Sequence, residues 1–228
     1  MLPMYSSTQA IVLDRQVKSK QRVADHGEVF TAEREVNAML DLVKQETERI
    51  DSRFLEPACG TGNFLVEVLR RKLAIVYKRY KRSQLEYERY SVIALSSIYG
   101  IDLLEDNVTE CQKRLFDIFD DEYSSLFKRK CKEECRRSAR FILQRNILWG
   151  DALTLATVGS NGEPITFSEW SAVNGSLIKR RDFIMDSLTD RQSIEDVILI
   201  SDLGERAFIP IPIKEFPLTH FLQLSKYA

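Results

Sequence analysis

Apolar positions along the chain follow two different spacings. Val36, Leu40 and Val43 lie three or four residues apart, which is the spacing of one face of an amphipathic helix. They predict a helix over residues 33–48, with Thr31 as its N-cap. The same spacing returns after residues 63 and 107, and a charged helix is predicted over residues 123–140.

Short apolar runs separate these helices and predict the strands. The runs cover residues 53–56, 92–102 and 146–151, and each ends in an acidic residue. Strands that alternate with helices favour an α/β fold in which a mostly parallel sheet carries helices on both faces.

The pattern changes after residue 155. A glycine-rich turn over residues 159–162 and several prolines interrupt the later apolar segments. Residues 165–171 and 197–200 are the strand candidates of this region. The chain is therefore divided into three parts: a lead-in of residues 1–25, a ligand-binding domain of residues 26–155, and an extension of residues 156–228 that completes the sheet or contacts a partner.

The composition is that of an ordinary globular protein. Hydrophobic residues make up 44% and charged residues 29% of 228 residues, and the formal net charge is -1, so nucleic-acid binding has to come from local basic patches. The N-terminus lacks the basic start and apolar core of a signal peptide, and no apolar run approaches the roughly 20 residues that span a bilayer. We expect a cytoplasmic protein without membrane contact.

The cysteines and histidines do not form a metal-binding pattern. Cys59, Cys111, Cys131 and Cys135 contain no pair of Cys-x-x-Cys motifs, and the chain has only two histidines. We therefore expect reduced thiols, no disulfide framework and no metal site.

The turn after the first predicted strand is rich in glycine and opens a helix. Gly60 and Gly62 permit backbone conformations and close contacts that a Cβ would prevent, and the free amides at a helix start bind a carboxylate. Ligands of open α/β sheets bind beyond the carboxyl ends of the strands. By itself, this Gly-x-Gly pattern fits a structural turn as well as a ligand loop.

The residues around this turn resemble the cofactor motifs of a known enzyme family. Residues 54–64, FLEPACGTGNF, resemble motif I of the adenine-N6 DNA methyltransferases of restriction-modification systems. Residues 27–31 resemble motif X, with Ala32 where the family often has Pro. Residues 100–103 and 150–153 resemble motifs II and III, in the family's order. The resemblance implies the Rossmann-like methyltransferase fold, S-adenosylmethionine as the cofactor and DNA as the substrate.

The resemblance also implies a role for each matching residue. In the family, motif X contacts the methionine part of the cofactor, the acidic residue of motif II bonds the ribose hydroxyls, and that of motif III receives the adenine amino group. From the residues alone, Asp102 fits a helix N-cap as well, and Asp151 fits an ordinary turn. The residues implied to bind the cofactor are Phe30, Thr31, Glu56, Pro57, Ala58, Cys59, Gly60, Gly62, Asn63, Phe64, Asp102, Leu103, Asp151 and Ala152.

The family's catalytic motif does not occur anywhere in the chain. This motif is Asn or Asp followed by Pro-Pro and an aromatic residue, and in the family it bonds the target amino group and stacks on the flipped base. The catalytic residues are therefore unknown. Trp170 and Asn174, in and after the first strand candidate of the extension, and Asp202, after the second, are weak candidates. Core packing is the alternative for Trp170, and a turn is the alternative for Asp202.

Three basic clusters have the density of Lys and Arg that suits a phosphate-binding face. They lie within residues 70–82, 128–140 and 179–181. The alternative is a solvated face neutralised by neighbouring acids. The last cluster follows the segment that takes the place of the catalytic motif in chain order, and it is predicted to hold the phosphates beside a flipped nucleotide.

The sequence leaves functions of different classes open. The first is an enzyme that transfers a methyl group to DNA adenine with a displaced catalytic motif. The second is a cofactor-binding subunit or truncated half, whose catalytic motif and target recognition come from a partner subunit. A third is an RNA or protein methyltransferase on the same fold. The missing catalytic motif separates the first from the other two, and a methyl-transfer assay decides between them.

Overall fold

The computed structural model describes most of the chain, namely residues 18–26, 28–159, 162–186, 199–200, 206–207 and 210–227. Its helices are α2 (Lys20–His26), α3 (Glu33–Asp41), α4 (Lys44–Thr47), α5 (Asn63–Tyr80), α6 (Gln84–Ser96), α7 (Glu105–Phe127) and α8 (Glu133–Asn146), with the 3-10 helices η1 (Lys128–Lys130) and η2 (Phe221–Tyr227). Its strands are β1 (Phe54–Glu56), β2 (Ile98–Asp102), β3 (Ile147–Asp151), β4 (Ala156–Thr157), β5 (Thr166–Ala172), β6 (Leu177–Ile184), β7 (Leu199–Ile200), β8 (Arg206–Ala207), β9 (Lys214–Glu215) and β10 (Thr219–His220).

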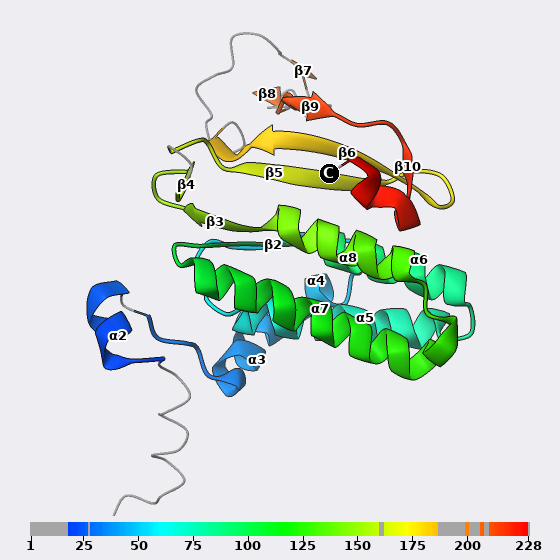
Figure 1. The fold of residues 1–228 in the computed structure, drawn as a ribbon, viewed down its shortest axis with the longest axis horizontal. Coiled ribbons are helices and arrows are strands. Elements are labelled where there is room, and N and C mark those ends of the chain that lie inside the picture. The colour runs from blue at the N-terminus through cyan, green and yellow to red at the C-terminus, as the bar shows by residue number, and fades with distance from the viewer. Residues whose placement is uncertain are drawn as a thin grey trace, which may run out of the picture.

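The parallel strands β1, β2 and β3, with β4 antiparallel beside β3, form the sheet at the centre of the fold, and Figure 1 shows its strands β2, β3 and β4. Glu56 of β1 lies opposite Gly100 of β2, and Asp102 of β2 lies opposite Trp149 of β3. The chain passes from β1 to β2 through α5 and α6, and from β2 to β3 through α7 and α8. These helical crossovers make the strands parallel, so the carboxyl ends of all three strands meet at one edge.

The central strand β2 buries different side chains on its two faces. Ile98 belongs to the main core with residues of α5 and α7, whereas Tyr99 and Ile101 pack with Ile165 and Phe167. The rings of Tyr99 and Phe167 meet edge to face, with 5.5 Å between their centroids. Figure 1 shows β5 and β6 on one side of β2 and β3, and α5 and α7 on the other.

This arrangement corrects part of the expected fold. The mixed α/β class agrees with the prediction, but only β1, β2 and β3 run parallel among the described residues, and an antiparallel sheet of β5, β6, β9 and β10 replaces the helices expected on the second face. The physical reason is the short connection between β5 and β6, residues 173–176. A parallel pair needs a crossover of a dozen residues or more, whereas a short turn joins antiparallel strands.

The first predicted helix is divided and has a different N-cap. The helix expected over residues 33–48 appears as α3 and α4, with a break between Asp41 and Lys44. Ala32 occupies the N-cap position and makes no side-chain cap. The prediction of Thr31 as the N-cap was therefore wrong. The backbone oxygen of Thr31 instead accepts a hydrogen bond from Asn63 Nδ2 at 3.0 Å.

Two other expected segments have different boundaries. The apolar run over residues 92–102 begins as the second half of α6, and only its end, from Ile98, is strand. Val92, Ala94 and Leu95 are all fully buried in this helix, and a continuous apolar run does not reveal its period. The helix expected over residues 123–140 is broken by Lys128, whose φ of 52° ends α7 before α8 begins.

The C-terminal extension packs on the same core as the helices. Phe221 and Leu224 of η2 are buried against α8, and the Leu224 amide donates a hydrogen bond to Ser138 Oγ at 3.3 Å. The strand expected over residues 165–171 is confirmed as β5. Of the strand expected over residues 197–200, only Leu199–Ile200 lies within the described residues, as β7.

The described residues form no disulfide, and Cys59, Cys111 and Cys135 are buried free thiols. Within the same ranges, no three His, Cys, Asp or Glu side chains gather as a metal site would need. Every helix of the described part of the chain is too short or too polar to cross a bilayer.

Candidate functional site

The loop between β1 and α5 depends on two glycines in the left-handed region. Gly60 has φ of 52° and Gly62 has φ of 88°, values that side chains disfavour. A Cβ on Gly60 would lie 3.0 Å from the Phe30 ring, and a Cβ on Gly62 would lie 2.5 Å from Cys111 Sγ. The motif X segment and α7 therefore approach the loop as closely as glycine allows.

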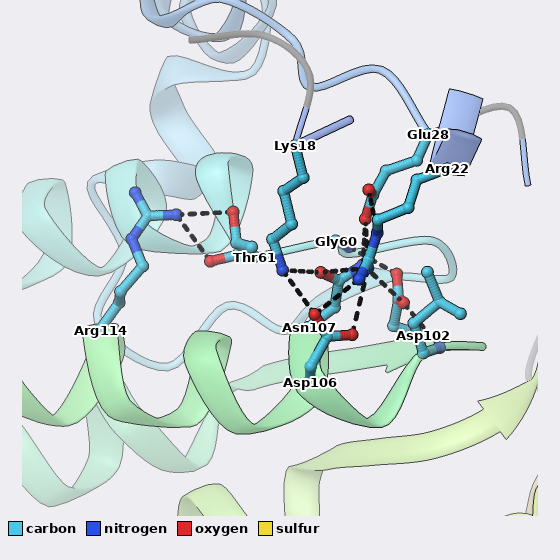
Figure 2. Close-up of polar contacts among 10 residues, drawn as sticks. Lys18, Arg22, Glu28, Gly60, Thr61, Asp102, Asp106, Asn107 and Arg114 are labelled. Carbon is cyan, nitrogen blue, oxygen red and sulfur yellow. Dashed lines mark hydrogen bonds and ion pairs between the residues drawn. The ribbon is translucent and has the colours of Figure 1, made fainter. Parts of the chain in front are cut away.

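An arginine of α7 holds this loop in place (Figure 2). Arg114 Nη1 donates to the backbone oxygen of Thr61 at 2.7 Å, to Thr61 Oγ1 at 3.1 Å and to Asn63 Oδ1 at 2.9 Å. The Asn63 amide in turn donates to the backbone oxygen of Thr31. The loop is thus fastened to both α7 and the segment before α3.

A cavity of about 570 Å³ opens at the carboxyl ends of the parallel strands. Each strand contributes its last residue to the lining: Glu56 from β1, Asp102 from β2 and Asp151 from β3. Every residue predicted to bind the cofactor lines this cavity except Gly62. Gly62 instead starts α5 as its N-cap residue and packs against Cys111.

Asp102 joins the glycine loop to the start of α7. Its Oδ2 accepts a hydrogen bond from the Gly60 amide at 2.8 Å, and its Oδ1 accepts from the Leu104 amide at 3.0 Å and from Asn107 Nδ2 at 3.1 Å. Leu104 occupies the N-cap position of α7, so Asp102 serves the helix start from outside it. The carboxylate is fixed, while it also borders the cavity.

The other two strand-end carboxylates have opposite electrostatic environments. Burial raises the pKa of Glu56, and a hydrogen bond from the backbone of Ala58 opposes that rise. The amide of Leu153 donates to Asp151 Oδ1 at 2.8 Å and lowers the pKa of Asp151 below its usual value. Asp151 is thus an anionic acceptor at the mouth of the cavity near neutral pH.

Cys59, within the glycine loop, is a thiol whose surroundings disfavour the thiolate form. A hydrogen bond with Cys111 raises the pKa of Cys59, and burial raises it further. A thiol nucleophile needs a lowered pKa, so Cys59 contributes packing to the cavity wall and not nucleophilic chemistry.

The weak catalytic candidates are not brought to this cavity. Trp170 is only 7% exposed and packs against Phe141 of α8. Its Nε1 donates a hydrogen bond to Asn146 Oδ1 at 2.9 Å. Pro164, just before β5, bridges to β4 at the cavity end of β3, whereas Trp170 contacts Asn146, the residue before β3. β5 therefore runs away from the cavity, and Asn174 in the following turn lies roughly 25 Å from the start of the strand. Neither residue lines the cavity. Asp202 lies outside the described residues.

The basic cluster of residues 179–181 is not an open phosphate-binding face. Lys179 pairs with Glu215 and Arg181 pairs with Glu169, each at 2.8 Å. Arg180 is 4% exposed and pairs with Asp182. The prediction that all three side chains meet DNA is corrected, because alternation along β6 turns Arg180 to the inner face.

Sequence reasoning missed two polar residues of the cavity, Glu28 and Asn107. Glu28 lies in the segment that resembles motif X, so its position pointed to the site although no role was assigned to it. Asn107 lies in the first turn of α7, where nothing in the local pattern distinguishes it from a surface residue.

These features define an α/β protein with a cavity between a glycine loop and the carboxylates at the ends of parallel strands, which is where open α/β sheets bind their ligands. The family model of the MmeI DNA-methyltransferase domain matches residues 29–156. This match covers more than half of the chain, and the chain belongs to that family. The prediction of a DNA methyltransferase domain is confirmed at this level. No curated protein and no solved structure gave a match.

Proposed function

We propose that the chain binds S-adenosylmethionine in the cavity at the ends of β1, β2 and β3 and serves the methylation of adenine N6 in DNA. The observation that carries the proposal is the convergence of Glu56, Asp102 and Asp151 with the glycine loop on this one cavity. Its volume of about 570 Å³ lies within the range of small-molecule sites, roughly 300–1,000 Å³.

The residues of the cavity suit the parts of this cofactor. Phe30 and Thr31, together with the loop amides at the start of α5, would hold the methionine end. Asp102 would accept a ribose hydroxyl, since the three hydrogen bonds that it already accepts leave about one of its four lone-pair sites free. Asp151 would accept the adenine amino group. The bound cofactor would supply the sulfonium methyl group, and these residues would orient it.

A specific observation favours a second candidate, in which the chain is the cofactor-binding part of a larger methyltransferase. In the described part of the chain, β1 pairs with β2 alone, which leaves its other edge open. Leu55 at this edge is 48% exposed, and it borders a hollow with the exposed Met39 and Val43.

An open edge with apolar surroundings is a site where another chain can add a strand. A strand added parallel to β1 would end beside Glu56, at the cofactor cavity, which is where ligand-binding residues of such sheets lie. A partner subunit would then bring the missing catalytic motif to the cofactor. The positions of Trp170 and Asn174 away from the cavity agree with this candidate.

Two measurements test the proposal. Calorimetry with S-adenosylhomocysteine and S-adenosylmethionine is expected to give binding, and no heat with folded protein at millimolar ligand would reject the cofactor site. Transfer of a labelled methyl group to DNA is then measured for the purified chain alone and with the products of neighbouring genes, followed by mass spectrometry of the nucleosides. N6-methyladenine from the chain alone supports the first candidate, and N6-methyladenine only with a partner supports the second.

A further inference from the structure

A chain of hydrogen bonds connects the N-terminal segment to Asp102 (Figure 2). Arg22 of α2 donates Nε and Nη2 to the two carboxylate oxygens of Glu28, at 2.6 and 2.8 Å. Asn107 of α7 donates Nδ2 to Glu28 Oε1 at 2.7 Å and to Asp102 Oδ1 at 3.1 Å. One amide group thus bridges the carboxylate of the N-terminal segment and the carboxylate at the end of β2.

The other end of the Asn107 side chain is fixed by cations. Its Oδ1 accepts from Lys18 Nζ at 2.7 Å and from Arg22 Nη2 at 3.2 Å. Arg22 Nη1 also donates to Asp106 at 2.7 Å. Because both cations approach the carbonyl oxygen of Asn107, its NH2 group is forced toward the two carboxylates.

The side chains at the centre of this network are largely buried. The Glu28 side chain is 7% exposed, and Asn107 is buried. Burial raises the pKa of Glu28, but hydrogen bonds from Arg22 and Asn107 outweigh it, and the pKa of Glu28 lies below its usual value. Glu28 is therefore an anion at neutral pH, and without its donors it would be a buried unpaired charge next to Asp102.

We propose that Asn107 and Glu28 are positioning residues for Asp102, and that Arg22 of α2 holds both of them in place. The inference rests on the proposed function, because the carboxylate that they orient is the one assigned to the cofactor ribose. Asn107 fixes Oδ1 of Asp102, so that Oδ2 keeps its free lone pair for the cavity. Binding of the cofactor and docking of α2 are then coupled, and by linkage each strengthens the other.

The first test is a double-mutant cycle in the affinity for S-adenosylhomocysteine. Asn107→Ala removes the donor to Asp102 and is expected to weaken binding about 5-fold to 10-fold, the net worth of roughly one ordinary intramolecular hydrogen bond, because Asn107 acts on the ligand only through Asp102. In the background of Asp102→Ala, the same change is expected to cost less than 2-fold, because no carboxylate remains to be positioned. A residue with a merely structural role would give equal losses in both backgrounds.

The second test uses Arg22, which lies outside the core and whose removal leaves the hydrophobic packing intact. Arg22→Ala is expected to weaken binding by a similar factor, again only when Asp102 is present, and Arg22→Lys is expected to restore part of the affinity. Arg34→Ala is the matched control, since Arg34 is 92% exposed and pairs with the neighbouring Glu35. That control is expected to bind like the wild type.

The outcomes separate this inference from the proposed function. Wild-type protein that fails to bind S-adenosylhomocysteine overturns both. Wild-type binding, with losses from Asn107→Ala and Asp102→Ala that simply add, overturns the positioning role alone. If Asn107→Ala does not show the wild-type circular dichroism spectrum, the cycle of Arg22→Ala with Asp102→Ala decides by the same criterion.

Discussion

Replacement of Gly62 by alanine is expected to combine two separate costs. The first is the backbone conformation, because φ of 88° lies in the left-handed region, where a Cβ costs about 1–2 kcal/mol. The second is overlap, because the new Cβ would lie 2.5 Å from the buried Cys111 Sγ. Overpacking of this kind costs about 1–3 kcal/mol. Gly62→Ala should therefore lower the free energy of unfolding by about 2–5 kcal/mol.

Matched variants separate these two costs by urea unfolding at pH 7. Gly175 has φ of 60° and would have nothing within 4 Å of its Cβ, so Gly175→Ala should show the backbone cost alone, about 1–2 kcal/mol. Cys111→Ala removes the clashing sulfur and leaves Cys111 Cβ as the next atom, at 3.4 Å. In that background, Gly62→Ala should cost about as little as Gly175→Ala.

The reasoning is refuted if Gly62→Ala costs the same with and without the Cys111 sulfur. Such a result would mean that the loop moves away from α7 instead of pressing against it. A loss of S-adenosylhomocysteine affinity without loss of stability would point to the same movement, because the loop amides would leave their positions.

Three further predictions follow from individual contacts. Arg114→Met removes the hydrogen bonds to the glycine loop and should lower the free energy of unfolding, measured in urea, by about 1.5–3 kcal/mol. It should also weaken cofactor binding in calorimetry. Trp170→Phe leaves the buried Asn146 Oδ1 without its donor and should cost about 1–3 kcal/mol, with unchanged cofactor affinity. Burial lowers the pKa of Lys72 to about 7 from 10.5, so the unfolded state binds more protons between these values and stability should rise with pH there. Lys72→Met should remove this part of the rise between pH 7 and 8.

Each of these predictions has a clear contradiction. Unchanged stability and affinity in Arg114→Met would show that the loop holds its shape without the arginine. A Trp170→Phe variant that keeps its stability but loses cofactor affinity would show that Trp170 contributes to the cofactor site. Equal slopes of stability against pH in wild type and Lys72→Met would show that Lys72 has its ordinary pKa.

The parts of the structure that local sequence determines were predictable. The strand ends at Glu56, Asp102 and Asp151 followed from short apolar runs stopped by polar residues, and the loop at Gly60 followed from the residue type that adopts a positive φ most readily. The same local rules placed the cavity, because parallel strands bring their carboxyl ends to one edge.

The parts that depend on distant contacts were not predictable. The second half of α6 is buried at every position except Ile93, so it carries no exposed polar face that would reveal a helical period. The basic run at residues 179–181 resembles a surface patch until β6 is paired, because pairing decides that Arg180 faces Asp182 and Trp170. The Asn107 amide donates to Glu28, 79 positions earlier in the chain, and to Asp102, 5 positions earlier. No local sequence pattern encodes the contact with Glu28.

The packing of η2 against α8 has a consequence for the order in which this protein folds during translation. Ser138 and Leu224, which meet in that contact, are separated by 86 positions in the chain. At about 5–20 residues per second, roughly 4 to 17 seconds of translation pass between them. Arg180 likewise lacks one of its partners until the end of η2 is synthesised, because its Nη1 donates to the backbone oxygen of Tyr227. During that interval the nascent chain can complete the glycine loop and its cavity while the apolar side of α8 is still uncovered.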